Sequence, residues 1–199
     1  MAAMIVDPGK VREFKNAEGF YRWLSKYYDK EDELWIKIHK VDSGLKSITP
    51  KEAIDVVLCW GWIDAVRKSL DDKSYLQRYT PRRKQSIWSQ INVANVSRLI
   101  EEGRMTAHGL KEVEAAKSDG RWGRAYPSGR NMKLPDDFQA AIEAKPRARN
   151  MLAKLNAQNR FALAFRIHNV KTEAARRKKI EAFVEMLERG ETIYPQPNK

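Results

Sequence analysis

The sequence predicts an α+β fold in which a small antiparallel sheet of about three strands packs on helices, followed by an all-helical C-terminal region. Two observations carry this prediction: strand-type alternation is confined to the residues before Pro81, and only helix-type spacing follows. A chain of 199 residues can bury one sizeable core and add a helical extension. We expect an α+β domain at 1–120, a basic aromatic linker at 121–134, a helical domain at 135–191 and a frayed tail at 192–199.

Apolar spacing and a start signal predict the first two helices. The aromatic residues and leucine between Phe20 and Tyr28 recur at three- and four-residue steps, which places one aromatic face on a helix. Thr49 and Glu52, with a proline after the threonine, form the pattern of a capping box. We expect the helix that starts there to bury the apolar residues up to Leu58.

Three segments predict the strands. Leu34 to His39 alternate in the period-two pattern of a half-buried strand, with Trp35, Lys37 and His39 in the second phase. The segments 62–70 and 74–80 predict a hairpin, because the intervening Asp71-Asp72-Lys73 is a polar turn.

Helices dominate after the hairpin. Segments 91–100 and 110–116 have helical spacing, and 118–133 is rich in glycine and basic residues, as expected of a connecting loop. Pro135 and Pro146 suit first helical turns, and apolar stripes follow at 161–168 and 180–187.

Positive charge is unevenly distributed along the chain. Lys and Arg number 38 against 26 Asp and Glu, a formal charge of +12. From Pro81 onward the count is 24 against 13, so almost the whole excess lies in the second part. Such an excess favours an acidic protein, a small anionic ligand or nucleic acid as partner, although it equally suits a solvated surface.

The start of the chain and its cysteine content predict a compartment. No basic segment followed by an apolar run opens the sequence, and no stretch approaches the roughly twenty apolar residues of a membrane span. The single cysteine, Cys59, excludes an internal disulfide. We expect a soluble cytoplasmic protein without a membrane span, either a monomer or a homodimer.

A polar and aromatic cluster around the hairpin is the leading candidate site. Asp64 is in phase with apolar neighbours, and a lone charge in apolar surroundings costs several kcal/mol, so we expect Arg82 and Arg83 to pair with it. The alternative is an internal salt bridge and a helix cap that lock the sheet to the next helix. The predicted site, for a small polar or anionic ligand or for a protein partner, comprises Trp62, Asp64, Arg82, Arg83, Ser86, Trp88 and Asn92, with Ser89 as a further donor.

Two other classes of function stay open. A nucleic-acid binder would use cations against phosphates and aromatic rings against bases. The candidate nucleic-acid residues are Arg121, Trp122, Arg124, Tyr126 and Arg130.

An enzyme would need a pocket at the sheet. The three histidines lack the spacing of metal ligands, and Cys59 ends an apolar helix, where a cysteine is usually an unreactive core residue. We therefore assign no catalytic residue, metal ligand or cofactor.

Several short motifs resemble a known family, the YdeI/OmpD-associated or bacteriocin-protection proteins (OmdA type). They are Glu52-Ala53, Cys59-Trp-Gly-Trp-Ile-Asp64, Tyr79-Thr-Pro-Arg-Arg83, Ser86-Ile-Trp-Ser89 with Asn92, Gly103-Arg-Met105, Gly109-Leu110, Gly120-Arg-Trp122, and Ala125-Tyr126. The helical end resembles the family's C-terminal domain through Pro135-Asp-Asp-Phe138, Lys171-Thr-Glu173, Arg176 and Ile180 to Gly190, although Ala175 stands where the family usually has threonine. The resemblance implies protection against bacteriocins, and it implies no reaction, cofactor or catalytic residue.

Overall fold

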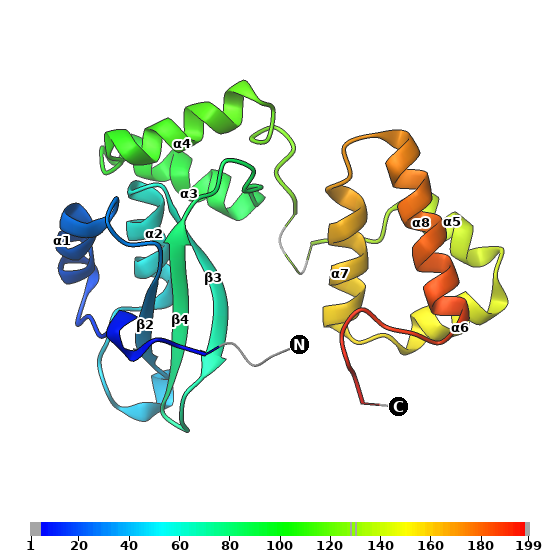
Figure 1. The fold of residues 1–199 in the computed structure, drawn as a ribbon, viewed down its shortest axis with the longest axis horizontal. Helices are drawn as coiled ribbons and strands as arrows, with labels where there is room; N and C mark the ends of the chain where they lie inside the picture. Colours follow the sequence, from blue (N-terminus) through cyan, green and yellow to red (C-terminus); the bar gives the residue numbers. More distant parts are fainter. Residues whose placement is uncertain (1–4, 128, 130, 198–199) are drawn as a thin grey trace. The chain divides into compact units, whose positions relative to one another are not determined.

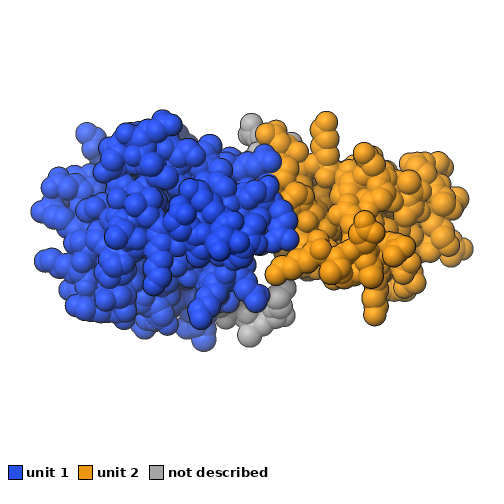
Figure 2. Space-filling view, turned by 90° about the horizontal axis from the view of Figure 1, so that it is seen from above, with its two compact units in different colours: residues 1–125 blue, residues 126–199 orange. Residues whose placement is uncertain are grey.

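The structure, a computed structural model, describes residues 5–127, 129 and 131–197. The chain divides into two compact units, residues 1–125 and 126–199, which Figure 2 shows in separate colours. Among the described residues, unit 1 contains the sheet and four α-helices, and unit 2 contains four further α-helices (Figure 1). The predicted α+β class with a helical C-terminal region is confirmed.

Unit 1 is built on a four-stranded sheet with the order β1-β2-β4-β3. Strand β4 (Ser74–Pro81) runs antiparallel to both β2 (Leu34–His39) and β3 (Trp62–Ser69), as predicted. The predicted number of strands was too low, because β1 (Val11–Arg12) pairs with β2 in parallel. A two-residue strand is too short to show alternation, so the sequence carries no signal for it.

The β3–β4 hairpin fixes the placement of Asp64. Trp62 lies opposite Pro81 and Asp64 lies opposite Tyr79, with a register shift between Asp64 and Arg67. Residues that face each other across antiparallel strands point to the same side of the sheet. Asp64 therefore points to the same side as the buried Tyr79 ring.

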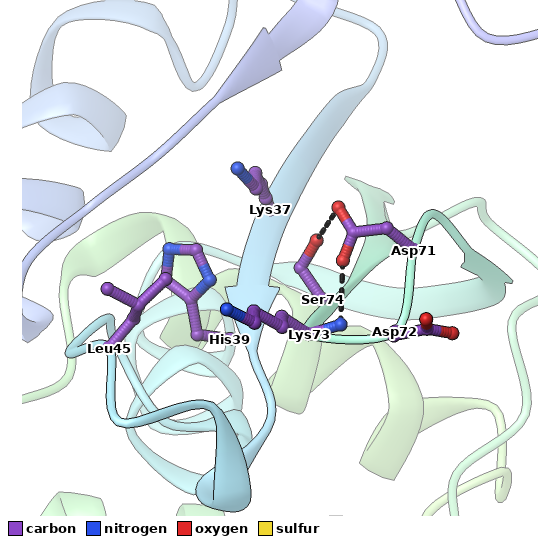
Figure 3. Close-up of a pocket in the computed structure, with 7 residues that line it drawn as sticks. All are labelled: Lys37, His39, Leu45, Asp71, Asp72, Lys73 and Ser74. Atoms are coloured by element: carbon purple, nitrogen blue, oxygen red, sulfur yellow. Dashed lines mark hydrogen bonds between the residues drawn. The ribbon is translucent and has the colours of Figure 1, made fainter.

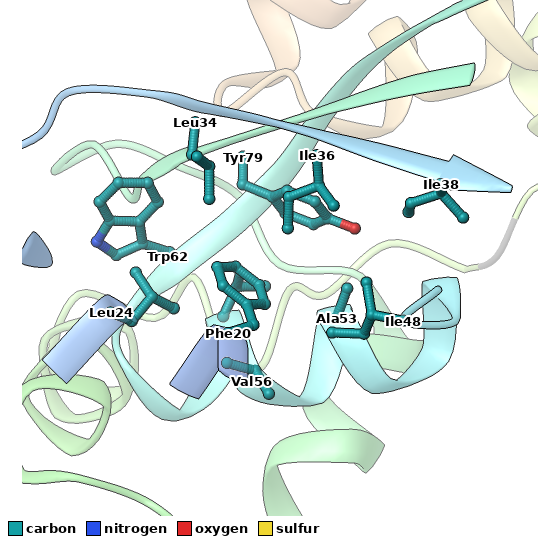
Figure 4. Packing of buried hydrophobic residues seen from close by; sticks show 11 residues of the cluster. Phe20, Leu24, Leu34, Ile36, Ile38, Ile48, Ala53, Val56, Trp62 and Tyr79 are labelled. Carbon is teal, nitrogen blue, oxygen red and sulfur yellow. The ribbon is translucent and has the colours of Figure 1, made fainter. Parts of the chain in front are cut away.

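Helices α1 (Ala17–Tyr27) and α2 (Pro50–Cys59) supply the apolar partners of the sheet. The predicted capping box is present: Thr49 N donates to Glu52 Oε2 at 2.8 Å, and Glu52 N donates to Thr49 Oγ1 at 3.2 Å. Burying one large apolar side chain stabilises the fold by about 1.5–3 kcal/mol. The cluster that joins helices and sheet (Figure 4) consists of Phe20, Leu24, Leu34, Ile36, Ile38, Ile48, Ala53, Val56, Val57, Trp62 and Tyr79.

The alternation predicted for β2 holds only in part. Its in-phase residues are buried in the cluster just described, but Trp35 on the other face is also only 1% exposed. Lys37 and His39, the other two residues of that phase, are partly exposed. One face of β2 is thus wholly apolar, and the other changes from a buried ring to polar side chains toward the strand end.

Helices α3 (Gln90–Glu101) and α4 (Ala107–Ser118) form a second apolar cluster with the end of α2. Asp55 accepts a hydrogen bond from Arg98 Nη2 at 2.6 Å, which ties α2 to α3. Gly109 lets α4 approach α2 closely, since a Cβ there would lie 2.3 Å from the Cys59 carbonyl oxygen. Any side chain at this position would therefore displace α4.

Unit 2 has its own core. Its helices are α5 (Asp136–Glu143), α6 (Pro146–Lys154), α7 (Ala157–His168) and α8 (Glu173–Glu188). Arg176 at the start of α8 donates from Nε and Nη2 to Asp137 at the start of α5, at 2.6 and 2.8 Å. The buried core residues are Phe138, Ile142, Ala148, Leu155, Leu163, Ile167, Ile180, Phe183, Val184 and Leu187.

The tail, where the sequence predicts fraying, is attached to unit 2 by hydrogen bonds of Tyr194 and Gln196. Asn159, which is 1% exposed, donates from Nδ2 to Tyr194 O at 3.0 Å and accepts from Tyr194 N at 2.9 Å. Gln196 Nε2 in turn donates to Lys154 O at 3.1 Å. A buried asparagine needs such partners, and here the tail supplies them.

Two shorter 3-10 helices, Pro8–Lys10 and Val41–Ser43, complete the described elements. Across the described part of the chain, every helix lacks the combination of length and apolar character that crossing a membrane requires.

Candidate functional site

Trp62, predicted to form a wall of the site, belongs to the core. Its ring is 1% exposed and meets the Trp23 ring edge-on, with ring centroids 6.3 Å apart. Its indole Nε1 donates to the Tyr28 carbonyl oxygen at 3.1 Å. Buried tryptophans use their one donor in this way, so the Trp62 ring holds α1 against the sheet.

Asp64 is a partly buried carboxylate whose charge interacts with Arg82, one of its two expected partners, and with Arg67. Burial raises the pKa of Asp64, and the positive charges of Arg82 and Arg67 oppose that rise. Burial together with the Asp64 charge raises the pKa of the Tyr79 hydroxyl in the adjacent strand. Asp64 thus interacts electrostatically with Arg82. Such an interaction is expected both in a binding site and in a structural ion-pair network.

Arg82 is held by an aromatic ring as well as by charge. Its residue is 8% exposed, and the guanidinium carbon lies 3.4 Å from the centroid of the Trp88 ring. Its backbone N donates to Gly61 O at 3.0 Å. The Trp88 ring, 2% exposed, meets the Trp122 ring edge-on at 4.9 Å. A desolvated cation–π pair contributes about 2 kcal/mol, so Arg82 and Trp88 stabilise this corner of unit 1.

The predicted neutral donors form a turn and a helix cap. Ser86 Oγ accepts from Arg83 N at 3.0 Å, and Ser86 N donates to Arg83 O at 2.8 Å. Ser89 Oγ accepts from Asn92 N at 3.1 Å and caps α3. The hydroxyls therefore bind backbone N–H groups. This is the arrangement expected if the cluster is a structural salt bridge and helix cap instead of a ligand site.

Between residues 83 and 91 the chain exposes two cationic and two apolar side chains. Arg83 and Lys84 are exposed, and Ile87 and Ile91 are 38% and 53% exposed. None of the ion pairs within the described residues involves Arg83 or Lys84. We call these four side chains the 83–91 surface.

Arg121 and Trp122 from the basic aromatic segment are built into unit 1. Arg121 donates from Nη1 to Ser86 O at 2.7 Å and from Nε to Asp119 Oδ2 at 2.6 Å. Trp122 is partly buried against Trp88 and packs on the second apolar cluster. These two side chains thus fasten the segment after α4 to the turn before α3.

The rest of that segment is divided between surface and unit 2. Arg124 is exposed and donates from Nε to Gly120 O at 3.3 Å. Tyr126 lies edge-on against Phe165 in unit 2, with ring centroids 4.9 Å apart. Arg130 lies outside the described residues. Trp122 and Tyr126 thus each pack against a ring of their own unit.

Neither a thiol site nor a metal centre is assembled in the described part of the chain. Burial raises the pKa of the Cys59 thiol to about 11, so this cysteine is a poor nucleophile near neutral pH. Within the same residues, no three His, Cys, Asp or Glu side chains are arranged to hold a metal ion.

A pocket that sequence reasoning missed lies at the opposite end of β4. Ser74 and Arg82 are eight residues apart, so roughly 26 Å of extended strand separates the pocket from the predicted cluster. The signals available were His39 and Lys37 in the polar phase of β2 and the charged turn after β3. This sheet-end pocket has a volume of about 310 Å³ and is lined by Lys37, His39, Leu45, Asp71, Asp72, Lys73 and Ser74 (Figure 3).

Comparison with known proteins divides the chain near the same place as the structure. Residues 12–112 match the family model of a domain of unknown function, DUF8412. Residues 131–190 match the model described as Bacteriocin-protection, YdeI or OmpD-Associated. No curated protein and no solved structure matched the chain. The bacteriocin-protection match thus covers the helical end only. The unit 1 motifs from Glu52 to Leu110 lie within the DUF8412 match, and those at 120–122 and 125–126 lie between the two matches. The chain therefore belongs to the DUF8412 family through unit 1 and carries in unit 2 a domain of the bacteriocin-protection, YdeI- or OmpD-associated family.

Proposed function

We propose that this chain is a bacteriocin-protection-type protein that acts in the cytoplasm by binding a partner. The match of residues 131–190 carries the proposal, because it is the one observation that points to a biological role. A single, buried and unreactive Cys59 suits a reducing compartment.

The 83–91 surface is the part of the Trp62 to Asn92 segment that we propose to contact the partner. Interfaces combine exposed apolar groups with charges that steer the partner. Ile87 and Ile91 supply the first, and Arg83 and Lys84 supply the second. An acidic protein with a small apolar patch fits this chemistry better than a small ligand does, because Trp62 and Trp88 are committed to packing.

A survival assay tests this proposal. Bacteria exposed to a panel of bacteriocins express either the natural chain or the double variant Arg83→Glu/Lys84→Glu. We expect the natural chain to raise survival and the variant to lose that gain, because reversed charges repel an acidic partner. The matched control reverses two exposed cations of α8, Arg177→Glu/Lys178→Glu, and changes the net charge equally.

Two results would contradict the proposal. Absence of protection by the natural chain against every bacteriocin of the panel would remove the role itself. Equal protection by both double variants would remove the 83–91 surface from it, provided that thermal melts show both variants to be folded.

Nucleic-acid binding by the basic second part stays a prediction. The packing of Trp122 and Tyr126 against other rings makes base stacking on them less favourable. Titration with single-stranded DNA at two salt concentrations tests it, since phosphate contacts weaken steeply as salt rises. Affinity that does not change with salt would exclude this function.

A further inference from the structure

The sheet-end pocket has a fixed frame. Lys40 N donates to Lys73 O at 2.8 Å, and Lys40 Nζ donates to the carbonyl oxygens of Asp71 and Asp72 at 3.2 and 3.1 Å. These bonds join the end of β2 to the turn between β3 and β4. The pocket therefore lies between two connections that the backbone holds together.

One of the two acidic side chains in the lining is already fully engaged. Ser74 Oγ donates to Asp71 Oδ2 and Lys73 N donates to Asp71 Oδ1, both at 2.8 Å (Figure 3). These two hydrogen bonds lower the pKa of Asp71. Figure 3 also shows the Asp72 carboxylate pointing away from the other lining side chains. Neither carboxylate is thus placed to hold a cation inside the pocket.

His39 presents a buried nitrogen without a partner. Its side chain is 7% exposed, and Nε2 lies 2.8 Å from Glu13 Oε1. Since an ionised carboxylate only accepts, Nε2 carries a proton, and in the neutral tautomer this leaves Nδ1 as an acceptor. Nδ1 is buried and has no hydrogen-bond partner among the described residues. Leaving a buried polar atom unpaired is unfavourable, so a ligand that donates a hydrogen bond to this nitrogen would be stabilised.

The cations of the pocket are less engaged than its acids. Lys37 Nζ lies 3.8 Å from Glu13 Oε2, too far for a hydrogen bond, and no ion pair within the described residues involves Lys73. Leu45, 54% exposed, provides an apolar wall beside them. Lys73 is thus an ammonium group outside these ion pairs, and Lys37 forms only the 3.8 Å ion pair with Glu13. His39 Nδ1 adds an acceptor and Leu45 an aliphatic side chain.

We propose that the sheet-end pocket binds a small hydroxycarboxylate. Its carboxylate pairs with Lys37 and Lys73, its hydroxyl donates to His39 Nδ1, and its aliphatic part lies against Leu45. Because Nδ1 is buried in the unliganded chain, binding requires the side chains that cover it to move aside. This site is independent of the 83–91 surface, so failure of either proposal leaves the other intact.

Titration of the full chain with three related probes, followed by NMR, tests the proposal. Lactate carries carboxylate and hydroxyl, propionate lacks the hydroxyl, and lactamide lacks the charge. We expect saturable shifts of pocket amides with lactate, a fivefold to tenfold weaker response to propionate, about the contribution of one hydrogen bond, and none with lactamide. Lactate alone is expected to move the ¹⁵N resonance of His39 Nδ1.

Variants separate the contacts. Lys73→Gln is expected to lower the affinity for both lactate and propionate. His39→Phe is expected to lower the affinity for lactate to that for propionate, while propionate still binds. Lys111→Gln, an exposed lysine of α4, is the matched control and is expected to change nothing. The proposal is overturned if neither acid gives saturable shifts or if lactamide binds like lactate. Should His39→Phe not fold, an Nδ1 resonance in the natural chain that lactate leaves unmoved overturns it as well.

Discussion

The two units differ in what they leave on their surfaces. Within the described residues, every large hydrophobic side chain that is markedly exposed belongs to unit 1, including Val41, Leu45, Leu70, Ile87 and Ile91. In unit 2 the large apolar residues are buried in one core or half-buried, as Phe161 and Phe165 are, and charged helix faces lie outside. Such a helical unit suits a self-contained domain, whereas exposed apolar groups beside cations suit a binding surface.

The same contrast separates the basic charge from the candidate sites. The formal excess lies after Thr80, yet the sheet-end pocket lies wholly before it, and the 83–91 surface lies just after it. Positive charge alone therefore does not identify where this chain binds. Exposed apolar groups, which lie in unit 1 among the described residues, distinguish the candidate surfaces better than charge does.

The largest expected effect follows from the separate cores. Leu163 is 0% exposed in unit 2, so Leu163→Ala should destabilise that unit by about 2–5 kcal/mol through a cavity. Because the core of unit 1 does not contain Leu163, calorimetry should show one transition shifting and the other staying. Equal shifts in the melting temperatures of all transitions would show that the two cores do not unfold independently. Arg166→Ala, an exposed change on the same helix, is the control.

The next effect concerns the close contact in unit 1. Gly109→Ala places a Cβ 2.3 Å from Cys59 O, and such overpacking should cost about 1–3 kcal/mol of unfolding free energy. Gly123→Ala meets no atom within 4 Å and should leave stability nearly unchanged. Chemical denaturation of both variants checks this. A stable Gly109→Ala variant would show that α4 is free to move away from α2.

Acid titration should give opposite signs in the two units. Hydrogen bonds from Arg176 lower the pKa of Asp137 below its ordinary 3.8, so the stability they give unit 2 is present above that value and lost as pH falls through the lowered pKa. Asp137→Asn should therefore destabilise unit 2 at neutral pH, by less than about 1 kcal/mol for this half-exposed pair. The difference should vanish in acid.

Asp64 in unit 1 should behave in the reverse way. Burial raises its pKa, so the stability of the neutral form is present below 3.8 and lost as pH rises through the raised value. Asp64→Asn should stabilise unit 1 at neutral pH and lose that advantage in acid. Thermal melts of the natural chain and the variant at neutral and acid pH test this prediction. An Asp64→Asn variant that is less stable at neutral pH would contradict it and would indicate a structural ion pair with Arg82.

Local patterns predicted the elements better than the sites. The capping box at Thr49 and the alternation of 34–39 are local; the structure contains the capping box and, apart from the buried Trp35, the alternation. β1 was missed because two residues carry no periodicity, and the tail was misjudged because its partner, Asn159, lies about forty residues away. Contacts of that range follow from the fold and leave no mark in a local window.

The candidate cluster shows the same limit. Sequence reasoning brought Asp64 and Arg82 together, and the structure places them within electrostatic reach. It also buries Trp62 and Trp88, which a residue type alone does not reveal, since tryptophan suits both a core and a ligand wall. His39 was only one histidine among three until β2, Glu13 and the charged turn gave it a pocket.

The most direct test of the central claim, that unit 1 binds through an exposed apolar surface, is bacteriocin survival with Ile91→Ser. Because Ile91 is 53% exposed, this change should alter stability by only about 0.5 kcal/mol. Leu110→Ser, an exposed apolar side chain of α4 outside the 83–91 surface, is the matched control. We expect Ile91→Ser to abolish protection while Leu110→Ser retains it. Full protection by a folded Ile91→Ser variant would contradict the account.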